Sequence, residues 1–173
     1  TFEGVGKVLE ELSKEFQYIV CDSPAGIEKG ANLALYFADD AFVVTNPEIS
    51  SVRDSDRMLG ILSSKSRRAE RNEEPIKEYL LLTRYDAQRV KSGEMLGLDD
   101  VQEILSLELL GIIPESKSVL SASNAGVPVI LDEKSEAGQA YSDVVARYLG
   151  EKRPHRFIDG KQSFLKRLFG GRS

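Results

Sequence analysis

Apolar residues along the chain follow two alternating spacings. Between Val5 and Phe16 they recur every three or four residues, as on one face of a helix. The next segment, Tyr18–Cys21, is a short unbroken apolar run, which is typical of a strand buried on both faces of a parallel sheet. Similar runs predict strands at 41–45, 79–83 and 109–113. Helical spacings predict helices at 28–37, 50–62, 116–124 and 135–149, with another helix opening at 98–101.

This order of elements predicts an α/β fold. Strands that alternate with helices form βαβ units, so we expect a parallel sheet covered by helices. The chain opens on a helix and supplies only about four strands, so N-terminal strands of the sheet are expected to be missing from it. The polar stretch 63–75 is expected to be a solvated loop or a frayed helix end, and Gly126 and Gly150 are placed to end helices.

Composition narrows the class of protein. The chain has 173 residues, of which 41% are hydrophobic and 29% charged, so one folded domain is expected. A single cysteine, Cys21, excludes an intrachain disulfide, and a single histidine, His155, excludes a zinc site or a histidine-based triad. No apolar run approaches the roughly 18 residues that span a bilayer, and the N-terminus is not a signal peptide. We expect a soluble protein of a reducing compartment, in the form of a fragment or trimmed chain.

Charge is distributed unevenly along the chain. Residues 150–173 hold seven Lys or Arg against two Asp or Glu, whereas residues 1–149 hold 16 against 26. An acidic body with a basic C-terminal segment argues against a general nucleic-acid surface. It favours a C-terminal segment that meets an anionic partner.

The sharpest local motif follows the first predicted strand. Ligands bind beyond the carboxyl ends of the strands in an open parallel sheet, and an acid placed there, such as Asp22, can reach a magnesium ion. Pro24 and Gly26 allow the backbone to turn tightly beside phosphates. The alternative for Asp22 is an ordinary helix N-cap. Cys21 is expected to be a buried small hydrophobe rather than a reactive thiol.

The C-terminal segment carries a second motif. In helical projection four apolar residues form one face and two basic residues lie on the other side, a pattern typical of a helix that lies in a membrane interface. The apolar face consists of Phe164, Leu165, Leu168 and Phe169, and the basic residues are Lys166 and Arg167. The alternative is a C-terminal helix docked on the protein's own core. We divide the chain into a body at 1–149, a polar linker at 150–160 and an amphipathic helix at 161–171.

Five segments together resemble the MinD family of deviant Walker A ATPases, which place the bacterial division site. They are CDSPAGIE, ALYFADDAFVVTNPEISSVRDSDR, LLLTRY, LGIIPE and FLKRLFGG, in this order along the chain. The resemblance implies a P-loop NTPase-like, Rossmann-like three-layer fold and an ATPase that uses ATP and Mg. No segment matches the Gly-rich phosphate loop, which the family places N-terminal to this part. We therefore expect this chain alone to lack normal ATP binding and hydrolysis.

The resemblance assigns roles position by position. Asp22 matches the acid that faces magnesium, directly or through water, and Ser23, Pro24 and Gly26 match the second switch. Thr83 and Arg84 match the segment that lies against the adenine, and Ile113, Pro114 and Glu115 match the loop on its other side. From the residues alone, Arg84 is an ordinary surface arginine.

The resemblance also implies partners and a location. The helix start with Arg53, Asp54 and Asp56 matches the surface that receives MinC and MinE, although the two acids can also simply complement the helix dipole. A homodimer with ATP bound, anionic lipids and the inner face of a bacterial cytoplasmic membrane are implied, and no nucleic acid is expected. The alternatives are a ParA-like ATPase that partitions DNA or cargo and a non-enzymatic membrane-tethered adaptor.

The amphipathic segment generates the first prediction. Leu168→Glu places a carboxylate where acyl chains should lie, so we expect it to abolish binding to liposomes while residues 1–149 stay folded. Lys166→Glu with Arg167→Glu should instead weaken binding mainly to anionic vesicles, and the loss should shrink as salt rises. Vesicle sedimentation measures both effects. If Leu168→Glu unfolds the body and leaves vesicle binding of the folded fraction unchanged, the segment is a docked core helix.

Overall fold

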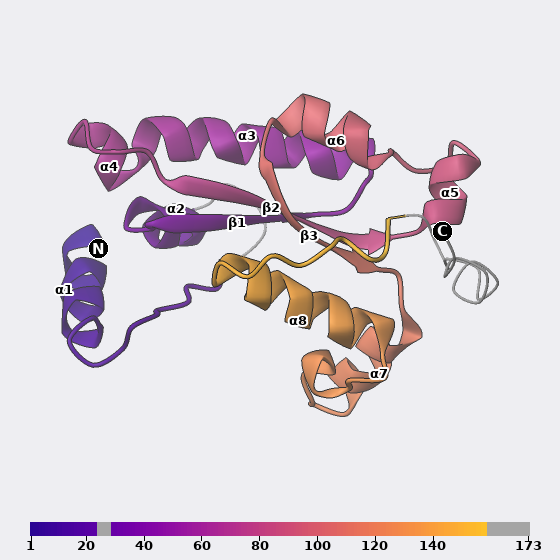
Figure 1. The fold of residues 1–173 in the computed structure, drawn as a ribbon. Helices are drawn as coiled ribbons and strands as arrows, with labels where there is room; N and C mark the ends of the chain where they lie inside the picture. The colour runs from indigo at the N-terminus through magenta and orange to yellow at the C-terminus, as the bar shows by residue number, and fades with distance from the viewer. Residues whose placement is uncertain (24–28, 159–173) are drawn as a thin grey trace. The chain divides into compact units, whose positions relative to one another are not determined.

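The structure, a computed structural model, describes residues 1–23 and 29–158 (Figure 1). Its helices are α1 Phe2–Leu12, α2 Lys29–Tyr36, α3 Ile49–Lys65, α4 Arg67–Glu70, α5 Ala87–Lys91, α6 Leu98–Leu105, α7 Lys117–Asn124 and α8 Glu136–Tyr148, with a 3-10 turn at Val129–Leu131. Its strands are β1 Asp40–Thr45, β2 Lys77–Tyr85 and β3 Glu108–Pro114, and their order in the sheet is β1-β2-β3. The predicted α/β class with a parallel, helix-flanked sheet is confirmed.

The described chain forms two compact units. Unit 1 comprises residues 1–41 and 53–78, and unit 2 comprises residues 42–52 together with the chain from Tyr79 onward. The strands β1 and β2 and the helix α3 each contribute residues to both units.

Unit 1 has a small core around the beginnings of β1 and β2. Ala41, Leu62 and Ile76 are buried there, and α2 adds Leu35. The polar stretch 63–75, expected to be a solvated loop or a frayed helix end, contains the last residues of α3 and the short helix α4. The Ser66 hydroxyl caps α4 by accepting a hydrogen bond from the Ala69 amide. Two further contacts anchor α4: the Arg68 guanidinium pairs with Asp39 at 2.5 Å, and the Tyr36 hydroxyl donates to Glu70 at 2.6 Å.

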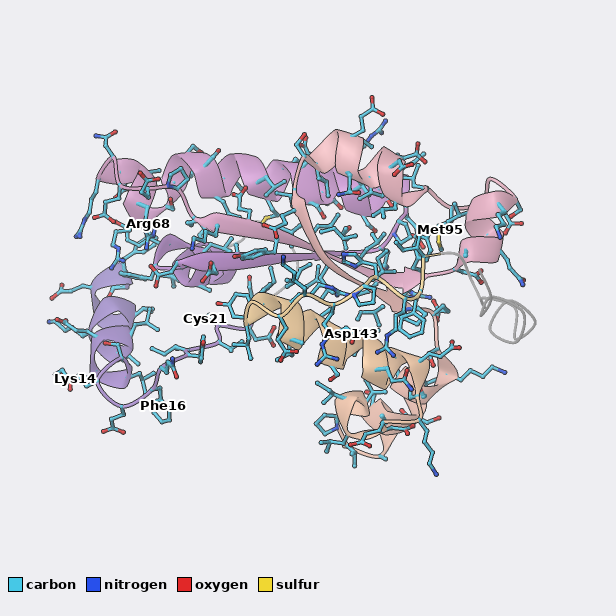
Figure 2. The ribbon with its side chains drawn as sticks, viewed as in Figure 1. Lys14, Phe16, Cys21, Arg68, Met95 and Asp143 are labelled. Atoms are coloured by element: carbon cyan, nitrogen blue, oxygen red, sulfur yellow. The ribbon has the colours of Figure 1, made fainter. Side chains whose placement is uncertain are left out.

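The strand predicted at Tyr18–Cys21 is absent. This segment is extended but carries no strand assignment, and Val20 is 90% exposed. An extended segment becomes a strand only when a neighbour supplies backbone hydrogen bonds, and the described sheet supplies none here. Cys21, labelled in Figure 2, is likewise exposed and not the buried hydrophobe expected from the apolar run.

Unit 2 is built on the parallel pair β2 and β3. Tyr79 lies opposite Glu108, Leu82 opposite Ile112, and Tyr85 opposite Pro114. The helix α8 packs on this pair through its buried face, so the core of unit 2 lies between sheet and helix. The buried members of that core are Leu81, Leu110, Ile113, Ala137, Ala140 and Val144.

Gly111 sets how closely α8 approaches β3. A Cβ atom built at this glycine would collide with Val144 Cγ2 and lie 3.3 Å from an Arg147 guanidinium nitrogen. The same guanidinium donates to the Leu110 carbonyl at 2.8 Å. The helix therefore rests directly on the strand backbone at this point, and only a residue without a side chain fits.

The segment after α8 folds back along that helix. Arg147 donates to the carbonyls of Arg153 at 2.9 Å and Pro154 at 2.7 Å, and Arg156 pairs with Asp143 at 2.7 Å. Phe157 packs against the core cluster. We call Glu151–Ile158 the strap; it covers most of the predicted linker, and it is bound to α8 along its length (Figure 1).

Gly111→Ala is predicted to destabilise the protein by about 1–3 kcal/mol, because the added methyl group overpacks the contact with Val144. Gly60→Ala is the matched control. Gly60 lies inside α3 with open space around it, so the same substitution should stabilise by up to about 1 kcal/mol through helix propensity. Urea unfolding measures both changes. Equal effects of the two substitutions would show that Gly111 does not set the helix–strand distance.

Candidate functional site

Polar side chains gather in unit 2 where the strands end. Asn46 directly follows β1, Thr83 and Arg84 lie near the end of β2, and Glu115 follows β3. Because parallel strands present their carboxyl ends at one edge of a sheet, these residues share that edge. We call Asn46, Thr83, Arg84, Pro114 and Glu115 the carboxyl edge.

One hydrogen bond links the exits of β1 and β2. The Thr83 hydroxyl donates to Asn46 Oδ1 at 2.9 Å and is also 3.4 Å from the Thr45 carbonyl. Thr83 is half-buried, so this bond is partly shielded from solvent and fixes the amide orientation of Asn46. Sequence analysis did not single out Asn46; the available signal was an Asn-Pro pair directly after a predicted strand, which favours a turn.

A second pair links the exits of β2 and β3. Arg84 Nε lies 3.0 Å from Glu115 Oε2, and the Glu115 amide donates to the Tyr85 carbonyl at 2.9 Å. The hydrogen bond to the Glu115 carboxylate raises the pKa of Arg84. Both side chains are exposed, so solvent screens the pair and the guanidinium remains available to a ligand.

The backbone of Arg84 has an unusual conformation. Its φ of +55° lies in the left-handed region, which costs energy for a residue with a side chain. Nonglycine residues held this way concentrate at functional sites, where the surrounding structure enforces them. The conformation turns Arg84 out of the strand toward Glu115, and it favours a role beyond that of an ordinary surface arginine.

The base of the carboxyl edge is well packed. Ile113 is buried at 2% exposure, and Pro114 is half-buried beside it. On the β2 side the short helix α5, which sequence analysis did not predict, is capped by the Asp86 carboxylate. Two hydrogen bonds anchor the loop after α5. Met95 Sδ accepts a hydrogen bond from the Asp86 amide, and the Leu96 amide donates to the Pro47 carbonyl at 3.0 Å (Met95 is labelled in Figure 2). A ligand at this edge would meet preformed strand ends.

The remaining predicted nucleotide residues lie in unit 1 or outside the described chain. Asp22 is exposed at the end of the extended segment, and Ser23 is half-buried. Pro24 and Gly26 lie outside the described residues. Within residues 1–23 and 29–158, no three histidine, cysteine, aspartate or glutamate side chains gather closely enough to hold a metal ion. The role of Asp22 therefore stays a prediction.

The predicted partner residues share an exposed part of α3. Arg53, Asp54 and Asp56 are all exposed, and Asp54 makes a loose i,i+3 pair with Arg57 at 3.8 Å. The first turn of α3 contains no acid, because the helix begins at Ile49. The interpretation that these acids complement the helix dipole is therefore wrong, since that effect fades beyond the first turn.

The amphipathic segment with Phe164, Leu165, Lys166, Arg167, Leu168 and Phe169 lies outside the described residues. Among the helices that the structure describes, none has both the length and the apolarity that a membrane crossing requires.

Replacing Arg84 tests the strained backbone. Arg84→Gly and Arg84→Ala both lose the pair with Glu115, but only glycine adopts the left-handed conformation freely. The glycine variant should therefore melt about 2–4 °C above the alanine variant. Arg89, an exposed residue inside α5, gives the matched control with the opposite order, because there alanine is the better helix former. The same order at both positions would contradict a strained Arg84.

Comparison with known proteins finds similar sequences and similar structures. No protein-family model matches the chain. The septum site-determining protein MinD of Escherichia coli K12 is 66% identical over 173 residues, which is 99% of this chain and 64% of that protein.

Two solved structures add the fold. The MinC:MinD cell division protein complex of Aquifex aeolicus contains a chain that is 39% identical with a TM-score of 0.80, covering 91% of this chain and 63% of that one. The MinD of Pyrococcus horikoshii complexed with Mg-ADP is 24% identical with a TM-score of 0.69, covering 87% of this chain and 58% of that one, and it supports the fold alone. The chain spans 64% of the length of the curated relatives that it matches first, and along 99% of its own length it is similar to septum site-determining MinD proteins.

Proposed function

We propose that the chain is the larger part of a membrane-associated ATPase that positions the bacterial division septum. The observation that carries this proposal is the 66% identity with a septum site-determining protein, which runs along 99% of the chain and is not confined to one motif. The DNA- or cargo-partitioning alternative is not favoured, because the high-identity relatives are septum site-determining proteins. The non-enzymatic adaptor has no specific observation in its favour.

The carboxyl edge is the proposed place of the adenine base. Arg84 and Thr83 would lie on one side of the base, and Ile113, Pro114 and Glu115 on the other. The geometry supports this because the two strand ends are joined by the pair between Arg84 and Glu115. An exposed guanidinium held in place can stack on a flat aromatic ring.

Asp22 is the proposed ligand of the magnesium ion, directly or through water. Magnesium is usually bound by one or two carboxylates together with phosphate oxygens and water, so the lone exposed carboxylate of Asp22 fits its chemistry. A bound magnesium ion would neutralise charge that develops on the transferred phosphate. The MinD of Pyrococcus horikoshii is complexed with Mg-ADP, so magnesium and a nucleotide are ligands of that protein.

The proposed protein partners act on α3. The exposed Arg53, Asp54 and Asp56 form a mixed-charge surface that suits a basic partner segment. The complex from Aquifex aeolicus supports MinC as a partner. A MinE-type protein and a second copy of the ATP-bound chain are proposed from the family resemblance alone.

The proposed location is the cytoplasmic face of a bacterial inner membrane. Burying two Phe and two Leu of the 161–171 segment gains several kcal/mol, at about 1.5–3 kcal/mol each as an upper figure, and each nearby Lys or Arg adds about 1 kcal/mol against anionic lipid. A helix of about ten residues is marginal alone in water, so one copy should bind weakly and reversibly. Two copies in a dimer would bind far better through effective concentration, which makes dimerisation a membrane switch.

Hydrolysis in a fusion tests the proposed activity. The fusion joins this chain to the remaining part of a MinD relative, which supplies the phosphate loop. It should hydrolyse ATP with magnesium, while the chain alone should bind negligible ATP. Asp22→Asn should reduce hydrolysis by about 10- to 100-fold, the usual effect of losing an outer ligand of a catalytic metal. Phosphate release measures the rate.

The matched control is Asp99→Asn, which removes the same charge from the exposed first turn of α6 and should leave hydrolysis unchanged. A fusion that folds and binds no Mg-ATP would overturn the proposed function. A fusion in which Asp22→Asn hydrolyses as fast as the parent would remove Asp22 from the site but leave the ATPase in place.

A further inference from the structure

The strap reverses the direction of the chain after α8. Its contacts pair residues in antiparallel order: the carbonyls of Arg153 and Pro154 meet Arg147, and further on Arg156 meets Asp143 and the Gln139 side chain. The strap therefore runs from the C-terminal end of α8 toward its N-terminal end, as the yellow segment beside α8 in Figure 1 shows.

The N-terminal end of α8 lies on the side of the carboxyl edge. The Ser135 hydroxyl, which caps α8, is hydrogen-bonded to the Ser118 hydroxyl, and Ser118 follows the end of β3 by a few residues. At the other end of the helix, Arg147 contacts the carbonyl of Leu110, near the start of β3. The strap thus carries the chain from the side where the strands start to the side where they end.

Two arginines hold the strap on α8, Arg156 through the buried carboxylate of Asp143 and Arg147 through backbone carbonyls. Asp143 is 5% exposed, and its carboxylate receives the Arg156 guanidinium, which also donates to the Gln139 side chain at 3.1 Å. The Arg147 guanidinium donates hydrogen bonds to three backbone carbonyls, those of Leu110, Arg153 and Pro154. Phe157 adds an apolar contact with the core. A polar linker that serves only as a spacer needs none of these contacts.

We propose that Asp143, Arg147 and Arg156 are positioning residues that hold the strap against α8, so that the amphipathic segment leaves unit 2 on the side of the carboxyl edge. This proposal rests on the proposed membrane docking of that segment. When the amphipathic segment docks on the membrane, the bound strap turns the carboxyl edge toward the lipid surface and keeps it close to that surface.

Chain lengths give the size of the effect. With the strap bound, five residues (159–163) separate Ile158 from Phe164, and with the strap released thirteen residues (151–163) separate Gly150 from Phe164. The greatest distance that the chain can span to Phe164 then grows from about 22 Å to about 50 Å, at about 3.6 Å per residue. The exit point also moves by about 16 Å, the length of α8 between Gln139 and Gly150.

The test places a fluorophore at either end of α8. Lys134→Cys labels the N-terminal side, because the neighbouring Glu133 carbonyl contacts Gln139, and Leu149→Cys labels the C-terminal side. Both are made in the full chain with Cys21→Ser, so that each protein carries one thiol. The probe is a vesicle that contains anionic phosphatidylglycerol and lipids with nitroxide headgroups, which quench only at short range.

Arg156→Ala releases the strap, and Arg153→Ala is the matched control. Both remove one arginine from the strap, but the Arg153 side chain pairs only with Glu151 within the strap, while its carbonyl still accepts from Arg147. Asp143→Ala with Arg156→Ala is included so that no buried carboxylate is left without its partner. Cleavage of residues 151–158 by proteinase K reports release and should accelerate about tenfold or more in the Arg156 variants only.

In the parent and in Arg153→Ala, quenching at position 134 should exceed quenching at position 149 by about twofold or more, since five residues separate the end of the bound strap from Phe164. In both Arg156 variants the difference should vanish or reverse while the amount of bound protein stays similar. A purely structural strap would change the melting temperature and leave the quenching ratio unchanged.

Two results would overturn the proposal. One is equal quenching at the two positions in the parent, and the other is an unchanged strap, by proteolysis or by quenching ratio, in the Arg156 variants. Absence of vesicle binding in the parent is a separate outcome, because it would overturn the proposed membrane docking itself and with it the role of the strap.

Discussion

The contact of α8 with the backbone of β3 at Gly111 is the constraint on which unit 2 depends. The absence of a side chain lets Val144 and the Arg147 guanidinium come down onto the strand, where Arg147 reaches the Leu110 carbonyl. The same guanidinium holds the carbonyls of Arg153 and Pro154. The close approach of α8 to β3 at Gly111 thus fixes both the core of unit 2 and the course of the strap after α8. A larger residue at position 111 would displace both.

The carboxyl edge depends on that core in a simple way. The buried Ile113 belongs to the core cluster that α8 covers, so packing against α8 fixes the position of the end of β3. The Glu115 amide is then bonded to the Tyr85 carbonyl, and its carboxylate meets Arg84. The left-handed backbone of Arg84 is held by the contacts around it, which include the pair with Glu115. Rigid strand ends that carry exposed polar groups are what a nucleotide site in a parallel sheet requires.

The sequence predicted most of the fold because its apolar spacing is clear. The strands at β1, β2 and β3 and the helices α2, α3, α6, α7 and α8 all follow from runs and periodicities of apolar residues. The failures have physical causes. Tyr18–Cys21 is apolar enough for a buried strand, but burial depends on a neighbour that the segment itself cannot specify. The short helices α4 and α5 are set by the caps Ser66 and Asp86, which hydrophobic spacing does not register.

The position of the carboxyl-edge residues at one end of the sheet follows in part from the sequence, while their role stays a prediction. Position by position resemblance brought together Thr83, Arg84 and Glu115, and the structure places these at one edge. The resemblance did not indicate that Asn46 is the hydrogen-bond partner of Thr83, or that Arg84 has a left-handed φ. Both features depend on how strands from distant parts of the chain meet. The strap was assigned to a linker on its polarity alone, since its contacts with α8 pair residues that no local pattern connects.

The central claim is that the carboxyl edge binds the nucleotide base. Hydrogen exchange of the fusion with and without Mg-ATP tests it most directly. The account predicts that the nucleotide slows exchange at residues 83–86 and 113–116, on both sides of the base, and leaves α6 at Leu98–Leu105 unchanged. A fusion that binds Mg-ATP and shows no protection at either strand end would contradict the claim.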